Sequence, residues 1–361
     1  MNKLYPWQDV LWQRWTGLRA RLPHALLLKG SLGVGKLDFA LILAQSLLCV
    51  KPHADGLACE NCDSCRWFEQ GTHPDFRFLL SGALAVEIQE SSKFSTSLIL
   101  KNCTQRVAEE ALEEQRKKDK KPSKAITIDQ IRTLNDFYNL SAHQGGYRIV
   151  LIHPAETMNA NAANALLKAL EEPSGQMLFI LGTHKPQQLP PTILSRCLTL
   201  AAPMPSPEAS VAWLKKQGVA NPESILAQAG FAPLEALRLS EESTESGEYE
   251  QFLREIKQPA QFDVYALAEQ LQKVEPAQVI HWLQQWCYDL ASAKLANKVR
   301  YHANLSDLID KLAMKIDAHH LLRYQKELGV AKREALHPLN PRLLFESLLL
   351  SYRQMMLGSA Q

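Results

Sequence analysis

The chain has 361 residues, of which 46% are hydrophobic and 22% are charged, so its composition excludes a disordered chain and its length allows about two or three domains. With 40 basic and 38 acidic residues, the formal net charge is +2. Charge alone therefore predicts neither a nucleic-acid-binding nor a membrane-binding protein.

The N-terminal residues lack the apolar core of a signal peptide. No apolar stretch approaches the roughly 18 residues that a membrane-spanning helix needs. We therefore expect a cytoplasmic protein.

A glycine-rich segment at 30–37 reads Gly-Ser-Leu-Gly-Val-Gly-Lys-Leu and is typical of a phosphate-binding loop. Its last position is Leu37, where the complete motif has a Ser or Thr hydroxyl that ligates magnesium. The apolar run at 25–28 predicts a buried strand before the loop, and the spacing at 36–48 predicts a helix after it. The remaining positions retain the backbone N–H groups and the lysine that contact phosphates. The candidate phosphate-binding residues are Gly30, Gly33, Gly35 and Lys36.

Four cysteines that follow this helix are close in sequence, which indicates a metal site: Cys49, Cys59, Cys62 and Cys65. Four thiolates favour tetrahedral zinc in a structural site, and an iron–sulfur cluster is the alternative. His53 and His73 are spare candidate ligands, which we interpret as ordinary loop residues. The other three cysteines lie far apart in the sequence, and we expect free or buried thiols there.

The segment 86–124 is rich in charged and small polar residues and predicts an inserted surface element. Pairs of opposite charges three or four residues apart are compatible with one exposed helix, but the composition favours a solvated, partly disordered loop. A basic contact with nucleic acid is a further alternative here.

The next elements complete an alternation of strands and helices. The residues at 125–132 predict a strand end and an N-capped helix, and 147–152 predicts a second buried strand, so we expect a parallel sheet covered by helices. A working ATPase has carboxylates after this second strand, whereas this chain has His153 and Pro154. Glu156 comes two residues later, and we interpret it as an ordinary helix-start acid. Two parts of the expected ATP site are therefore altered.

Further segments identify a family. They are 71–75 (Gly-Thr-His-Pro-Asp), 161–173 (Asn-Ala-Ala-Asn-Ala-Leu-Leu-Lys-Ala-Leu-Glu-Glu-Pro), 178–183 (Leu-Phe-Ile-Leu-Gly-Thr) and 194–197 (Leu-Ser-Arg-Cys). In order and spacing they resemble the AAA+ clamp-loader family. The resemblance implies an α/β P-loop AAA+ domain at 1–203, with a parallel sheet, helices on both faces, a zinc module at 49–65 and the charged insertion at 86–124.

The resemblance also gives roles to single residues. Thr183 lies at the polar strand-end position called sensor 1. Arg196 lies where clamp-loader subunits present an arginine finger, in trans, to ATP bound by the neighbouring subunit. A permanently charged guanidinium suits that role, while a structural ion pair is the alternative. Leu234 lies near the place where the family has the arginine of its second sensor.

The proline-rich segment at 202–207 marks a boundary, after which the pattern is almost wholly helical. The resemblance implies a small helical lid at 204–245 and an all-helical collar at 246–361 that holds the subunits in a ring. Trp282 and Trp286 belong to an amphipathic stripe that fits either a core or an interface.

The resemblance thus implies a non-hydrolysing subunit of a DNA polymerase III clamp loader. Its partners would be the gamma/tau and delta subunits of a hetero-oligomeric ring and, through the complex, the sliding clamp and primer–template DNA. Its cofactor would be structural zinc, with ATP or ADP bound weakly if at all. One alternative is an active gamma/tau-like ATPase, which Lys36 favours and Leu37, His153 and Pro154 oppose. Another is a separate zinc-containing nucleic-acid-binding protein.

Overall fold

The computed structural model describes residues 3–90, 98–118, 121–139, 142–143, 146–173, 175–242, 247–335 and 339–358. The chain forms two compact units, Met1–Ala209 and Ser210–Gln361, which are described separately below. Within the described ranges, no helix combines the length and the apolar character needed to cross a membrane.

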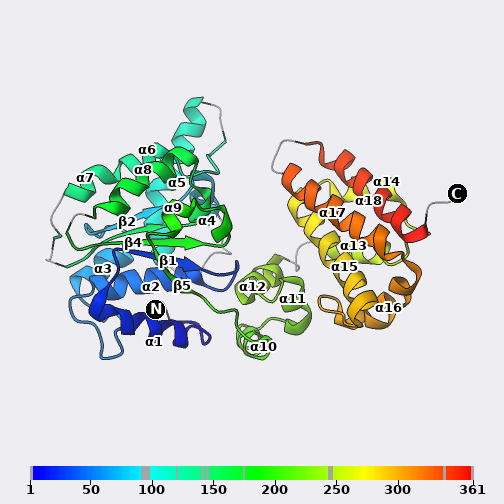
Figure 1. Ribbon diagram of the computed structural model, residues 1–361, viewed down its shortest axis with the longest axis horizontal. Helices are drawn as coiled ribbons and strands as arrows, with labels where there is room; N and C mark the ends of the chain where they lie inside the picture. The colour runs from blue at the N-terminus through cyan, green and yellow to red at the C-terminus, as the bar shows by residue number, and fades with distance from the viewer. Residues whose placement is uncertain are drawn as a thin grey trace. The chain divides into compact units, whose positions relative to one another are not determined.

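A parallel sheet forms the centre of the first unit (Figure 1). Its strands are β1 (Ala25–Lys29), β2 (Phe76–Leu79), β3 (Arg148–Ile152), β4 (Met177–Thr183) and β5 (Leu198–Ala201). They lie in the order β2-β3-β4-β1-β5, and each neighbouring pair runs parallel. The strands predicted at 25–28 and 147–152 are confirmed. Every residue of β3 and β4 is buried, as the continuous apolar runs of both segments indicate.

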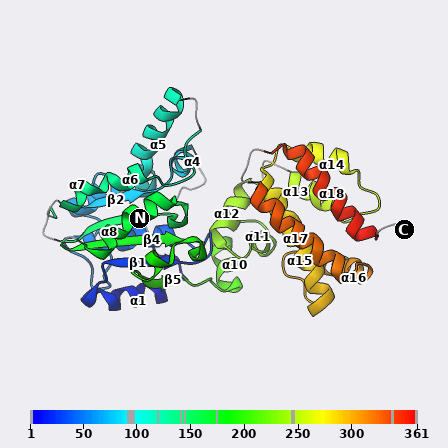
Figure 2. The ribbon, with the colours of Figure 1, turned by 45° about the horizontal axis from the view of Figure 1, so that its top comes forward.

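Helices cover both faces of this sheet, as predicted. They are α1 (Asp9–Leu18), α2 (Lys36–Leu48), α3 (Asp63–Glu69), α4 (Gly82–Glu90), α5 (Leu98–Lys118), α6 (Ile128–Arg132), α7 (Leu134–Asn139), α8 (Ala160–Glu171) and α9 (Pro191–Leu194). In β1, Leu26 and Leu28 pack with α1–α5, whereas Ala25 and Leu27 pack with α6–α9. Figures 1 and 2 show α1 on one side of the sheet and α6 and α8 on the other.

Local sequence signals explain where several of these helices begin. The sequence predicted an N-capped helix within 125–132. In the structure the N-cap of α6 is Thr127, which forms a capping box with Gln130. Asn159 accepts a hydrogen bond from the N–H of Ala162 and so caps α8. The strand end predicted just before α6 is reduced to an isolated bridge between Ile126 and Met158.

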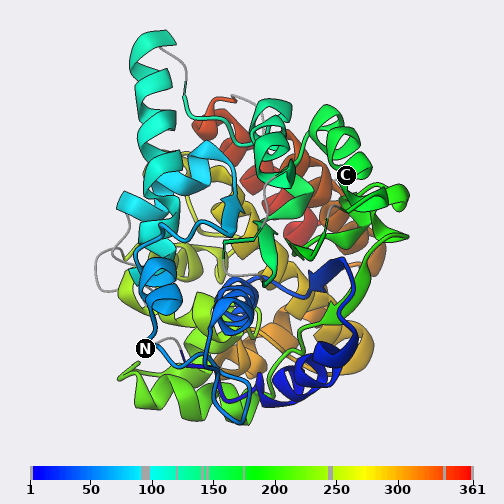
Figure 3. The ribbon, with the colours of Figure 1, turned by 90° about the vertical axis from the view of Figure 1, so that its left-hand side faces the viewer.

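The loop predicted within 86–124 is wrong over residues 98–118, which form the 21-residue helix α5. The sequence allowed one exposed helix here as the alternative, and that helix is present. It forms because Ile99, Leu100 and Ala108 are buried in the sheet-facing core, where the N-terminal part of α5 packs on α3 and α4. These apolar residues are sparse among many charges, which is why the composition suggested a loop. The far end of α5 projects beyond the rest of its unit (Figures 1, 2 and 3). Residues 91–97 and 119–120 of the predicted insertion lie outside the described residues.

The second unit is helical. Its helices are α10 (Pro207–Lys216, which begins at the end of the first unit), α11 (Pro222–Gln228), α12 (Pro233–Glu242), α13 (Glu248–Ile256), α14 (Val264–Leu271), α15 (Pro276–Ala296), α16 (Ser306–Lys315), α17 (Ala318–Glu334) and α18 (Pro341–Leu357). A small apolar cluster joins α10–α12, and a larger one joins α13–α18. Trp282 and Trp286 are both buried in the larger cluster. The domain boundaries at 203 and 245 stay predictions.

A buried polar network links α15 to the loop that follows it. The Asp289 carboxylate is fully buried and accepts hydrogen bonds from the backbone N–H groups of Arg300, Tyr301 and His302 at 2.8 to 3.1 Å. Nδ1 of His302 lies 2.8 Å from the same carboxylate, and its Nε2 lies 2.9 Å from the Tyr249 hydroxyl. Asp289 thereby fixes the loop after α15, in which the Arg300 guanidinium stacks 4.8 Å from the centre of the Phe231 ring.

Candidate functional site

The candidate phosphate-binding loop at 30–37, called the phosphate loop below, lies between β1 and α2, where the sequence predicted it, and its last two residues begin α2. Gly33 and Gly35 adopt left-handed backbone angles, with φ of 73° and 79°, which favour glycine. A Cβ atom on Gly35 would come within 2.5 Å of the Tyr5 ring, so only glycine fits there. A Cβ atom on Gly30 would lie 3.0 Å from the carbonyl oxygen of Ala202, at the end of the neighbouring strand β5.

An N-terminal strap, which we define as residues 5–8, holds this loop from outside. The Trp7 indole donates a hydrogen bond to the Val34 carbonyl at 3.0 Å, and the Gln8 amide donates one to the Gly35 carbonyl at 2.8 Å. Tyr5 hydrogen-bonds the carboxylate of Asp38, whose pKa burial raises to about 6. Sequence reasoning missed the strap, because no local pattern places an N-terminal segment against a distant loop.

Lys36 begins α2 and is almost fully buried, with 3% of its surface exposed. Its ammonium donates a 2.5 Å hydrogen bond to the Ser31 carbonyl within the same loop. Burial lowers the pKa of Lys36 to about 8, and the nearby Glu156 carboxylate opposes that shift. The loop therefore carries a buried amine that is easily deprotonated for a lysine.

Two histidines and one glutamate lie beside Lys36. The rings of His153 and His184 meet edge to face with centroids 5.0 Å apart, and Glu156 accepts a 3.0 Å hydrogen bond from the backbone N–H of His184. Burial lowers the pKa of His184 to about 4 and that of His153 well below its ordinary value, with Lys36 adding to both shifts. Nδ1 of each histidine and Oε2 of Glu156 have no hydrogen-bond partner among the described residues.

Glu156 lies in the first turn of a 3-10 helix (Ala155–Thr157), as expected for a helix-start acid. Its carboxylate also lies close enough to Lys36 to interact with it electrostatically. The sequence showed its position after the strand, while the pairing with His184 depends on a contact between segments 28 residues apart.

Thr183 is fully buried at the end of β4, directly opposite Lys29 of β1. Its carbonyl accepts a hydrogen bond from the N–H of Gly30 at 3.3 Å, and its hydroxyl accepts one from the N–H of Lys185 at 3.1 Å. The sensor 1 candidate thus adjoins the first residue of the phosphate loop.

Arg196 lies at the other end of the sheet. It follows α9 and precedes β5, whose residue Leu198 pairs with Leu26 of β1. Arg196 is therefore level with the start of β1, and about six residues of strand at roughly 3.3 Å each, or about 20 Å, separate that level from the phosphate loop. The Arg196 guanidinium pairs with the Glu171 carboxylate at 2.6 Å and donates to the Thr192 carbonyl at 2.9 Å.

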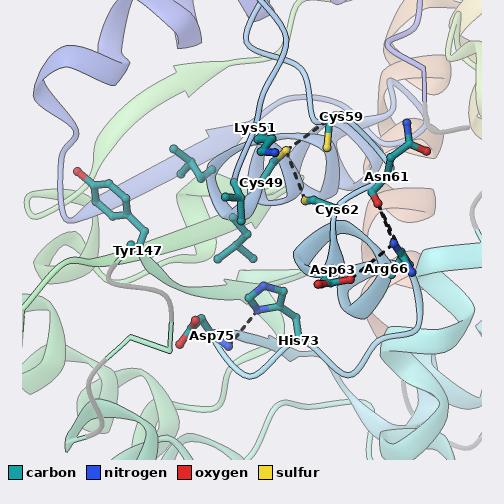
Figure 4. A pocket seen from close by; sticks show the side chains of 14 residues that line it. Cys49, Lys51, Cys59, Asn61, Cys62, Asp63, Arg66, His73, Asp75 and Tyr147 are labelled. Atoms are coloured by element: carbon teal, nitrogen blue, oxygen red, sulfur yellow. Dashed lines mark hydrogen bonds and ion pairs between the residues drawn. The ribbon is translucent and has the colours of Figure 1, made fainter.

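The four predicted metal-binding cysteines are brought together in the first unit, with their sulfur atoms all within 4.8 Å of one another. Figure 4 shows three of them, Cys49, Cys59 and Cys62. The Sγ separations are 3.9 Å for Cys49 and Cys62, 4.0 Å for Cys59 and Cys65, and 3.4 Å for Cys62 and Cys65. Four sulfurs bound tetrahedrally at about 2.3 Å from zinc lie about 3.8 Å apart. The donor set and its spacing therefore fit a closed tetrahedral site.

Hydrogen bonds around the cysteines orient them. The backbone N–H groups of Asn61 and then Cys62 lower the pKa of Cys59 to about 6. The N–H of Cys59 in turn points to Sγ of Cys49 at 3.2 Å. N–H groups directed at sulfur stabilise thiolate ligands in the same way as they stabilise other anions.

Neither spare histidine joins the cysteines among the described residues. Nε2 of His73 lies 2.9 Å from the Ser64 hydroxyl, and Nδ1 accepts a 3.0 Å hydrogen bond from the N–H of Asp75. His73 thus connects α3 to the residue that precedes β2. Figure 4 shows its hydrogen bond with Asp75. A cavity of about 860 Å³ lies beside this region and is lined in part by Lys51, Arg66 and Tyr147.

The sheet has the strand order β2-β3-β4-β1-β5, the phosphate loop follows β1, and a helical region follows the sheet. These features together define the AAA+ class of P-loop proteins. Comparisons with known proteins narrow the class. The family model for "DNA polymerase III, delta subunit" matches residues 16–205, and the model for the C-terminal part of that subunit matches residues 246–354.

The DNA polymerase III subunit delta' of Pseudomonas aeruginosa is 34% identical over 98% of this chain and 98% of its own length. The subunit of the same name from Escherichia coli is 32% identical over 60% of this chain and 51% of its own. A solved gamma subunit-related protein of Thermotoga maritima has 17% identity and a TM-score of 0.46, and the match covers 96% of this chain and 100% of that one. The chain belongs to the family of DNA polymerase III delta-prime subunits and is a clamp-loader subunit of that type.

Proposed function

We propose that this chain is a clamp-loader subunit without ATPase activity of its own, which supplies Arg196 in trans to ATP held by a neighbouring gamma/tau-type subunit. Its other proposed neighbour is a delta-type subunit, and the assembled ring would act on the sliding clamp and on primer–template DNA. The names of the relatives, which include delta-prime and tau subunits, support this assembly.

The position of Arg196 carries the trans part of the proposal. About 20 Å of sheet separates Arg196 from the phosphate loop of its own chain, which is far beyond the reach of an arginine side chain. Its side chain is 34% exposed, so a partner can approach it. A guanidinium that reaches the γ-phosphate of a neighbour can stabilise the charge of the transferred phosphoryl group.

The absence of turnover is supported by the residues around Lys36. Leu37 has no hydroxyl for magnesium, and His153, with its pKa far below the ordinary value, supplies an uncharged imidazole where a carboxylate would hold the metal. Any ATP or ADP would bind weakly, through backbone N–H groups and the lysine.

The proposed cofactor is one structural zinc ion held by the four cysteines. Zinc favours four thiolates without an open position, and such sites contribute to folding rather than to catalysis. The cluster joins the end of α2 to α3 through Cys49 and Cys65, so its role would be to fix α3 against the sheet.

The decisive experiment measures ATP turnover by the isolated chain and by the complex reconstituted with gamma/tau and delta subunits, each with wild-type protein and with Arg196→Ala. We expect no turnover by the isolated chain and a loss in the complex when Arg196 is replaced, by about a thousandfold at the neighbouring site. Substantial turnover by the isolated chain would contradict the proposal and favour the gamma/tau-like ATPase. If the complex with Arg196→Ala were as active as the wild-type complex, the proposed arginine-finger role of Arg196 would be refuted.

A further inference from the structure

Glu171 holds Arg196 from a different element. It is the last residue of α8, where the chain turns away at Glu172 and Pro173, and Arg196 follows the short helix α9. Oε1 of Glu171 lies 2.6 Å from Nη2 of Arg196, the range of a charge-assisted hydrogen bond. The contact joins segments 25 residues apart, so the fold and not the local sequence creates it.

The contacts of Arg196 leave part of its guanidinium available. Nη2 donates to Glu171, and Nη1 donates to the Thr192 carbonyl at 2.9 Å and to the Ser195 hydroxyl at 3.4 Å. These three contacts occupy three of the five N–H donors, and none of them uses Nε. An arginine held on one side in this way can still donate to a phosphate on the other side.

We infer that Glu171 is a positioning residue for the arginine finger, which holds the Arg196 guanidinium in place while its remaining donors face the neighbour's phosphate. The inference rests on the trans role proposed for Arg196. Arginine stays charged with or without a partner, so the carboxylate adds orientation and not charge to the finger. An unrestrained arginine has many rotamers, and restricting them before the partner arrives lowers the entropic cost of reaching the transition state.

The expected effect is moderate, because the pair is partly open to solvent. The two side chains are 34% and 49% exposed, and exposed ion pairs change equilibria by up to about fivefold. In Glu171→Gln we therefore expect a two- to fivefold fall, roughly, in the part of the turnover that depends on Arg196. The fall should be in kcat with KM for ATP unchanged, because Glu171 itself does not contact the nucleotide.

The experiment uses the complex reconstituted with the ATP-hydrolysing subunit and compares four proteins with wild type: Glu171→Gln, Arg196→Ala, the double variant and Glu172→Gln. Glu172 is the matched control, because it is exposed, adjacent in sequence and has the same charge. We expect Glu172→Gln to match wild type and the double variant to match Arg196→Ala, since a residue that acts only through Arg196 has no effect once Arg196 is gone. Thermal unfolding of each isolated chain checks that folding is unchanged.

The outcomes separate two failures. If Arg196→Ala leaves turnover unchanged, the finger itself is absent and the inference falls with it. If Arg196→Ala lowers turnover but Glu171→Gln does not, or raises it, the finger stands and the positioning role of Glu171 is refuted. A further fall in the double variant below Arg196→Ala would also refute it, because Glu171 would then act by another route.

Discussion

Replacing Asp289 tests how strongly one buried carboxylate organises the second unit. In Asp289→Ala, the backbone N–H groups of Arg300, Tyr301 and His302 lose their fully buried acceptor. A buried unsatisfied N–H group costs about 1 to 3 kcal/mol, and the loss of one partner from a buried, hydrogen-bonded ionic group costs about 3 to 5 kcal/mol. We expect the free energy of unfolding of this unit to fall by about 3 to 5 kcal/mol.

The same contacts predict a dependence on pH. Burial would raise the pKa of Asp289, but hydrogen bonds from the His302 ring and the three backbone N–H groups outweigh burial and lower it overall. A carboxyl group with a lowered pKa stabilises the folded state fully above its unfolded pKa, and this contribution is lost as the pH falls through the folded value. Wild type should therefore lose stability in acid over a range in which Asp289→Ala, already destabilised, changes less.

Urea unfolding and amide hydrogen exchange at residues 297–305 together measure this effect. Asp307→Asn is the control, because Asp307 is exposed in the same unit, and its loss should cost at most about 1 kcal/mol as a first-turn acid of α16. If Asp289→Ala shifts the unfolding free energy by less than about 1 kcal/mol, or if the loop amides exchange as slowly as in wild type, the reasoning about the buried network is refuted.

Three further predictions concern the first unit. Cys65→Ser should reduce bound zinc, measured by elemental analysis, from an equimolar amount to almost none and should speed amide exchange in α3, and full zinc retention would contradict the four-thiolate site. Gly35→Ala should destabilise the unit by about 2 kcal/mol, because a left-handed residue gains a Cβ that meets Tyr5, whereas Gly17→Ala, with open space in a helix, should be neutral or stabilising, and equal melting temperatures would count against this. Because the pKa of Lys36 is lowered from 10.5 to about 8, the unfolded chain binds more protons between these values, so stability should rise with pH across that range. Unfolding of Lys36→Met should lack this rise, and an identical pH profile in both proteins would argue against a buried amine.

Features that depend on neighbouring residues in the sequence could be predicted, and those that depend on tertiary contacts could not. The strand at 25–28, the phosphate loop and the helix at 36–48 follow from local patterns, and the structure has all three. The cysteine spacing likewise indicated a site whose sulfur atoms the fold gathers.

The missed contacts join segments distant in sequence. Glu156 approaches Lys36 and His184 only because the ends of β1, β3 and β4 meet at one edge of the sheet. Tyr5 reaches Gly35 across 30 residues, and Glu171 reaches Arg196 across 25. The error over 98–118 has another cause, because a few apolar residues at helical spacing decide the packing of α5 while its many charges dominate the composition.

The separation of Arg196 from the phosphate loop gives each such chain a direction. With the proposed finger at one end of the sheet and the candidate phosphate-binding loop at the other, subunits that serve one another's ATP in this way must associate head to tail, in a heterologous arrangement. A chain that has an arginine finger but no working nucleotide site can stimulate hydrolysis only in the neighbour on one side. The neighbour on its other side has no bound ATP in this chain for its own finger to reach. The loss of catalytic groups at one end of one chain can therefore decide the order of subunits around an assembly. No additional recognition surface between the subunits is needed for that order.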